Sequence, residues 1–143
     1  MRISSVSAAV IGLMVITASA AHAQAPKAAP KGKAAAVKAP SGDAAAGATA
    51  FNARCRACHG LGGIGSMIGP DLRGVYGAKS ASSAYPKYSA ALKASGLTWT
   101  EANMDTWLQG PGKMVPGSTM ILAPMPPPDV RKNIIAYVAT LKK

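Results

Sequence analysis

The stretch Cys55-Arg56-Ala57-Cys58-His59 decides more about the fold than any other part of this 143-residue chain, whose only cysteines it contains. Two thiols separated by two residues and followed directly by an imidazole form the pattern of c-type haem attachment. Each thiol can form a thioether with one vinyl group, and the histidine can reach the iron from the same segment. We therefore expect one covalent haem c, attached at Cys55 and Cys58, with His59 as an iron ligand.

Two other kinds of site use the same residue types. A structural zinc ion takes four ligands, whereas this segment supplies three. A redox-active Cys-x-x-Cys pair is expected between a strand and a helix. Here the residues before Cys55 favour a helix, with Gly47 and Phe51 on the same face as Cys55. The sequence thus favours haem over both alternatives.

The N-terminus has the layout of a secretory signal peptide. Arg2 precedes an apolar run over 8–16, and small residues lead to Ala21-His22-Ala23. We expect residues 1–23 to be removed after Ala23. An uncleaved membrane anchor is the alternative, since no charge interrupts the apolar stretch before Lys27.

Residues 24–40 consist almost entirely of Ala, Pro, Lys and Gly. Such a segment buries too little apolar surface to fold, so we expect a disordered tether followed by a domain over 41–143. Of the 16 lysines and arginines, Arg2 and four lysines precede residue 41, which leaves 11 basic against 5 acidic residues, a net charge of +6. Export and the lack of aromatic residues interleaved with basic clusters argue against nucleic acid. Acidic protein surfaces are the expected partners.

The remaining pattern is helical, with long loops. Thr100 and Ser41 are candidate N-caps, and Gly110-Pro111 is a stop signal. Asp129 suits the positive end of a C-terminal helix that follows three prolines. Helices are therefore expected at about 42–57, 89–94, 100–109 and from 129 onward.

The C-terminal helix is expected to pack on the first helix. Its apolar stripe comprises Val130, Ile134, Tyr137, Val138 and Leu141. Gly47 would allow a close crossing near Phe51 and Tyr137. Residues 60–88 carry few regular signals and would depend on the haem as their core, so we expect an apoprotein that is largely unfolded.

Several motifs beyond the attachment segment resemble class I cytochrome c, most closely its mitochondrial and bacterial c2 branch. They lie in family order over about 42–143: Gly69-Pro70-Asp71-Leu72-Arg73-Gly74-Val75-Tyr76-Gly77, Tyr88, Leu97-Thr98-Trp99, Pro116-Gly117-Ser118-Thr119-Met120 and Ile134-Ile135-Ala136-Tyr137-Val138. The resemblance implies an all-α class I cytochrome c fold, with three main helices, a short helix and long loops around one covalent haem.

The sixth iron ligand is expected to be a methionine. Of the five in the domain, Met67 is too near the attachment loop and Met104 is explained by packing, while Met114, Met120 and Met125 lie in a Pro- and Gly-rich loop. Pro-Gly-Ser-Thr-Met120 resembles the ligand loop of the c2 branch, and Ala-Pro-Met125-Pro-Pro resembles that of shorter bacterial cytochromes. Met120 lies 17 residues before Tyr137, the c2 spacing, so we predict Met120 as ligand and keep Met125 as the alternative.

The resemblance also assigns the surroundings of the haem. Pro70 would offer its carbonyl to the proximal histidine, while Tyr88, Trp99 and Ser118, the last in place of a threonine, would contact a propionate. Three residues depart from the family pattern: Ala78 replaces a basic residue, Leu92 a polar amide, and Trp107 a tyrosine near the methionine.

A monomeric, periplasmic one-electron carrier is therefore expected, moving electrons between respiratory or photosynthetic complexes, or between a dehydrogenase and an oxidase. Exposed basic residues at Lys79, Lys87, Lys93, Lys113 and Arg54 or Arg56 would guide docking. Enzymatic catalysis is not expected, because no paired carboxylates or free histidine remain. The alternatives are an electron module tethered to the periplasmic face of the inner membrane or bound to one partner enzyme, and a ligand-sensing haem protein.

Overall fold

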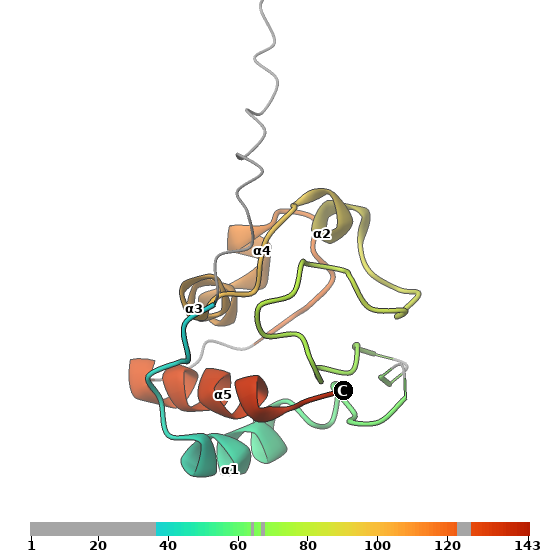
Figure 1. Cartoon of the computed structure of the whole chain (residues 1–143). Coiled ribbons are helices and arrows are strands. Elements are labelled where there is room, and N and C mark those ends of the chain that lie inside the picture. Colours follow the sequence, from blue (N-terminus) through green and yellow to red (C-terminus); the bar gives the residue numbers. More distant parts are fainter. Residues whose placement is uncertain (1–36, 64, 67, 123–126) are drawn as a thin grey trace, which may run out of the picture. The chain divides into compact units, whose positions relative to one another are not determined.

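The computed structural model describes residues 37–63, 65–66, 68–122 and 127–143. Within these ranges the chain forms five helices joined by long loops (Figure 1) and no strand, only two isolated β-bridges. The helices are α1 (Ala44–Arg54), α2 (Ala90–Ala94), α3 (Glu101–Gln109), α4 (Pro111–Met114) and α5 (Pro128–Thr140). The predicted all-α fold is confirmed, with α1, α3 and α5 as the main helices and α4 as an addition.

The predicted signal peptide and most of the predicted tether lie outside the described residues, as does Met125. None of the helices in the described ranges is long and apolar enough to cross a membrane.

The start of α1 differs from the expectation. Asp43, not Ser41, is the N-cap, and its carboxylate accepts hydrogen bonds from the amides of Ala45 (2.8 Å) and Ala46 (3.1 Å). Ser41 instead donates its amide and its hydroxyl to the Glu101 carboxylate, at 3.1 and 2.7 Å. The prediction of Ser41 as cap was wrong because a residue sixty positions away competes for its hydroxyl.

The other caps follow the sequence closely. The Ser89 hydroxyl accepts from the amide of Leu92, and that of Thr100 accepts from the amide of Asn103 at 3.2 Å. Gly110 ends α3 as predicted. Pro111, expected only to stop that helix, also begins α4, because proline lacks just the N–H that the first turn of a helix leaves unpaired.

Helices α1 and α5 cross at Gly47, side by side in Figure 1. A Cβ on Gly47 would overlap the Asn133 carbonyl and lie 2.9 Å from the Tyr137 Cβ. One turn on, the rings of Phe51 and Tyr137 are 5.2 Å apart, and Phe51 is fully buried. The close crossing near these two aromatic residues is confirmed, although the most buried residue of α5 is Ile135, which the predicted stripe omits.

Residues just before α1 are bound to the domain. The Tyr76 hydroxyl donates to the carbonyl of Lys38 at 2.6 Å, and the amide of Asp43 donates to the Asn133 side chain at 2.8 Å. Val37, the first described residue, packs beside Gly77. The last residues of the predicted tether thus contact the outer side of the domain.

An ion pair joins α3 to α5. Arg131 is buried, and its Nε donates to Asp105 Oδ1 at 2.6 Å while its second nitrogen reaches Oδ2 at 3.3 Å. Gln109 donates to the same carboxylate at 2.7 Å. The hydrogen bond from Arg131 lowers the pKa of Asp105, against an opposing effect of burial.

We expect Asp105→Ala to lower the free energy of unfolding of the holoprotein by about 1–3 kcal/mol, because it leaves a buried guanidinium without its partner. Asp129→Ala removes an equal charge from an exposed site on α5 and should cost less than about 1 kcal/mol. The pKa of Asp105 is lower in the folded protein than in the unfolded chain. Its contribution to the free energy of unfolding is therefore complete above the ordinary carboxyl pKa and is lost as the pH falls through the pKa of the folded protein. Guanidinium unfolding at neutral and acidic pH measures both effects; equal losses in the two variants would contradict the prediction.

Candidate haem site

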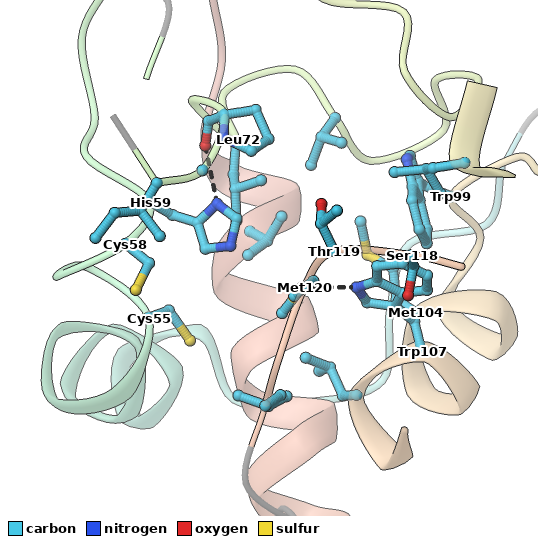
Figure 2. Close-up of a pocket in the computed structure, with 18 of the residues that line it drawn as sticks. Cys55, Cys58, His59, Leu72, Trp99, Met104, Trp107, Ser118, Thr119 and Met120 are labelled. Atoms are coloured by element: carbon cyan, nitrogen blue, oxygen red, sulfur yellow. Dashed lines mark hydrogen bonds between the residues drawn. The ribbon is translucent and has the colours of Figure 1, made fainter. Parts of the chain in front are cut away.

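The predicted site residues meet in one cavity of about 340 Å³, shown in Figure 2. Its apolar walls come from α1, α2, α3, α5 and the intervening loops. All eight residues expected from the sequence line it: Cys55, Cys58, His59, Pro70, Tyr88, Trp99, Ser118 and Met120. The structure thus brings together residues separated by up to 65 positions.

The attachment motif forms a tight turn directly after α1. The amides of Cys58 and His59 both donate to the carbonyl of Cys55, at 3.1 and 2.8 Å. Burial raises the pKa of the Cys55 thiol to about 11, which is opposite to the low pKa of reactive or metal-binding thiols. Within the described ranges, no three His, Cys, Asp or Glu side chains are placed to share a metal ion. The raised pKa of Cys55 argues against the reactive-dithiol alternative.

His59 is oriented by a backbone carbonyl. Its Nδ1 lies 2.9 Å from the oxygen of Pro70, so the N–H on Nδ1 donates there and Nε2 faces the cavity (Figure 2). Burial lowers the pKa of His59, and the Pro70 carbonyl only partly opposes this, which favours the neutral imidazole that binds iron. A Cβ on Gly69 would lie 2.8 Å from the imidazole Cε1, so only glycine lets this loop pass so close to the ring.

Met120 projects into the same cavity from the loop before α5. Its side chain is half-buried, and its sulfur accepts a hydrogen bond from Trp107 Nε1 at 3.1 Å (Figure 2). Met104 also lines the cavity, where it is buried in the core beside Trp107, whereas Met114 does not line it. Met67 and Met125 lie outside the described residues.

The polar groups of the cavity are few. Ser118 Oγ is buried and has no hydrogen-bond partner among the described residues, which calls for a polar group supplied from elsewhere. The hydroxyls of Tyr88 and Ser83 are 2.7 Å apart. Trp99 is buried, with its ring 5.3 Å from that of Trp107.

Sequence reasoning missed several contributors to the cavity wall, of which Tyr85 and Leu72 are examples. Tyr85 is buried and packs edge-on against Tyr88, with ring centroids 5.2 Å apart. An aromatic residue three positions before Tyr88 in a polar loop was the available signal. Leu72, which also lines the cavity, is half-buried and was quoted only as part of a motif.

Only part of the expected basic ring borders the cavity. Arg54 and Lys87 line it, while the ammonium of Lys79 lies 3.5 Å from the carbonyl of Gly96. Lys93, Lys113 and Arg56 are exposed but do not line the cavity. Two large apolar side chains line the cavity and are also exposed to solvent, Ile68 at 70% and Ile121 at 97%.

This set of donors fits a covalent haem. Two thiols lie beside a neutral imidazole, a thioether reaches into the same cavity, and the walls are apolar. The unpaired hydroxyl of Ser118 could bind a carboxylate such as a haem propionate.

Comparisons with known proteins agree with this geometry. The family model for cytochrome c matches residues 44–142. Cytochrome c of Tetrahymena pyriformis is 39% identical over 105 residues, which cover 73% of this chain and 94% of that protein. Cytochrome c-550 of Nitrobacter winogradskyi is 40% identical over 103 residues, which cover 71% of this chain and 94% of that protein.

Among solved structures, cytochrome cH from Methylobacterium extorquens matches with 44% identity and a TM-score of 0.59, over 69% of this chain and 99% of that one. The matched residues include the attachment turn, the loop that carries Pro70 and the loop that carries Met120. With its Cys55-x-x-Cys58-His59 motif, the chain binds haem c covalently and belongs to the cytochrome c family, as an electron-transfer protein and not an enzyme.

Proposed function

We propose that this chain is a periplasmic one-electron carrier in which His59 and Met120 would hold the haem iron between them. The observation that carries the proposal is that His59 and Met120 line the same apolar cavity. The Nδ1 of His59 is taken up by the Pro70 carbonyl, which leaves Nε2 toward the cavity, and the Met120 sulfur is held by a hydrogen bond from Trp107. When bound, haem c supplies a one-electron iron couple. A thioether ligand favours its reduced state, which suits a carrier.

The protein's own residues would keep this couple suited to fast transfer. Pro70 holds His59 in one tautomer, and the buried side chains of Phe51 and Ile135 keep water from the inner end of the cavity. With His59 and Met120 both holding the iron, no position would be left for a substrate or gas. Electron transfer through the exposed edge is then the chemistry available.

Four residues define what we call the cavity rim: Arg54, Ile68, Lys87 and Ile121. All four line the cavity and are exposed, so apolar and positively charged groups share one surface next to the haem. Exposed apolar residues flanked by charge are typical of protein interfaces. The rim therefore suits transient docking on an acidic redox partner.

The docking role can be tested with small oxidants of opposite charge. We expect reduced holoprotein to be oxidised by ferricyanide at a rate that falls as ionic strength rises. Combining Arg54→Gln with Lys87→Gln should lower the low-salt rate about threefold, and oxidation by a cationic cobalt phenanthroline complex should not slow.

Lys142→Gln with Lys143→Gln is the matched control, because it removes the same charge from exposed residues that do not line the cavity. An equal fall in the control pair would mean that total charge, and not the rim, governs the encounter.

A tethered electron module is the second candidate. It is favoured by the place where residues 37–43 contact the domain. On α3, Glu101 and Asp105 face the side where Val37 and Lys38 lie, whereas Met104 and Trp107 line the haem cavity. A tether leaving at Val37 would thus keep the cavity rim free for docking.

Cell fractionation with N-terminal sequencing separates the two candidates. The diffusible carrier predicts a periplasmic chain that begins at Gln24. Retention in washed membranes of a chain that still carries residues 1–23 would instead support the tethered module.

A further inference from the structure

We propose that Ser66 is a positioning residue that holds the Pro70 carbonyl at the Nδ1 edge of His59 and thereby lowers the reduction potential. The inference deepens the proposed function and rests on His59 as an axial ligand of the iron. Its basis is one hydroxyl that bonds to the backbone on both sides of the imidazole: at Cys58, which precedes His59, and at Gly69, which precedes Pro70.

The Ser66 hydroxyl has three backbone partners. It donates to the carbonyl of Cys58, and it accepts from the amides of Ile68 at 3.1 Å and Gly69 at 3.2 Å. A hydroxyl has one proton to donate and two lone pairs that accept, so these three bonds use its full capacity. The side chain thus joins the attachment turn to the loop that returns past it.

The backbone of the same loop adds to this connection. The Ser66 amide donates to the carbonyl of Gly69 at 2.9 Å, and Gly65 forms an antiparallel bridge with Pro70. Ser66 and Gly69 therefore bond to each other in both directions. A shift of Gly69 away from the attachment turn would break the bond between Ser66 and Cys58.

Gly69 in turn sets the position of the acceptor for the imidazole. It is buried against His59, where a Cβ would lie 2.8 Å from the ring Cε1 and 2.9 Å from the Cys58 carbonyl oxygen. The next residue, Pro70, has its oxygen 2.9 Å from His59 Nδ1. Because a hydrogen bond weakens steeply with misalignment, a small displacement of Gly69 would weaken this one. Ser66 thus acts on His59 through Gly69 and Pro70.

The direction of the effect on the potential follows from charge. A carbonyl that accepts from Nδ1 increases the electron density that the imidazole can donate from Nε2. Oxidised iron carries one more positive charge than reduced iron and gains more from this donation. A firm hydrogen bond to Pro70 therefore stabilises the oxidised state and lowers the potential.

The test uses the full holoprotein with Ser66→Ala, which removes the hydroxyl. We expect the midpoint potential to rise by a threefold change in the redox equilibrium, about 30 mV at 59 mV per tenfold for one electron. In the proton spectrum of the reduced protein, the His59 Nδ1 proton should move upfield and exchange faster with solvent, because its hydrogen bond to Pro70 is weaker.

Ser95→Ala is the matched control for the loss of a bonded hydroxyl. The Ser95 hydroxyl donates to the Leu92 carbonyl at 2.8 Å and lies 3.0 Å from the Ser80 hydroxyl, so both partners lie outside the attachment turn and the Pro70 loop. Its removal should lower stability and leave the potential and the His59 proton unchanged. An equal rise of the potential in both variants, or a Ser66→Ala protein with the wild-type potential and His59 proton, would overturn the proposal.

Amide exchange in the reduced wild-type protein serves if Ser66→Ala yields no holoprotein. The Ile68 side chain is exposed, so slow exchange of its amide reports the bond to Ser66 and would support the proposal. Exchange of that amide as fast as in an unstructured peptide would overturn it.

The long-wavelength absorbance of methionine ligation, recorded on the same samples, separates this inference from the proposed function. Its absence from the wild-type protein would remove Met120 from the iron and leave the role of Ser66 at His59 standing. A wild-type potential and His59 proton in Ser66→Ala would remove that role and leave the ligand pair standing.

Discussion

Met120→Ala is expected to abolish the long-wavelength absorbance that methionine gives to oxidised haem and to lower the midpoint potential by on the order of 100 mV or more, since the choice of axial ligand sets potentials over about 0.8 V. The thioether favours reduced iron, and alanine leaves that position to water or to an added ligand. Exogenous imidazole should then bind readily to the oxidised variant. Absorbance spectra with a redox titration measure all three effects.

Met114→Ala is the control, because Met114 is half-buried on α4 but does not line the cavity. It should keep the absorbance and the potential. Met125→Ala tests the alternative ligand in the same way. If the long-wavelength absorbance is lost in Met125→Ala and retained in Met120→Ala, Met125 and not Met120 is the iron ligand.

Gly47→Ala is expected to destabilise the holoprotein by about 3 kcal/mol or more, which is the upper part of the range for overpacking. The added methyl group would overlap the Asn133 carbonyl, and backbone cannot turn away as a flexible side chain can. Helices α1 and α5 would have to separate, which would loosen Phe51 from Tyr137. Guanidinium unfolding followed by far-ultraviolet circular dichroism measures the loss.

Gly112→Ala is the matched control, because a Cβ there meets no atom within 4 Å and the residue is exposed on α4. Its effect on stability should be small, and the helix propensity of alanine favours it. A Gly47→Ala protein as stable as this control would show that the crossing can widen without cost.

Much of the site could be predicted because its chemistry is concentrated in short segments. Cys55, Cys58 and His59 need only the turn that follows α1 to converge, since the amides of Cys58 and His59 both donate to the Cys55 carbonyl within the same five residues. The caps at Ser89 and Thr100 likewise bond three residues ahead. Interactions of this range depend on residue order alone, so a pattern of residue types is enough to locate them.

The errors and omissions involve partners that are distant in the chain. Ser41 bonds to Glu101 instead of capping α1, and the buried Arg131 of α5 is paired with Asp105 of α3. In each case the local sequence leaves the partner undetermined, and the choice depends on which elements pack together.

The contact between Trp107 and Met120 shows the same division. The resemblance to class I cytochrome c is enough to place both residues near the haem. The kind of cofactor, its attachment and its candidate ligands likewise follow from residue types and spacing. That the indole donates to the sulfur at 3.1 Å depends on where α3 lies against the loop before α5. Interactions between neighbouring residues depend on the order of those residues and can be predicted from it. A directional hydrogen bond between distant segments forms only after packing of the core has fixed their positions.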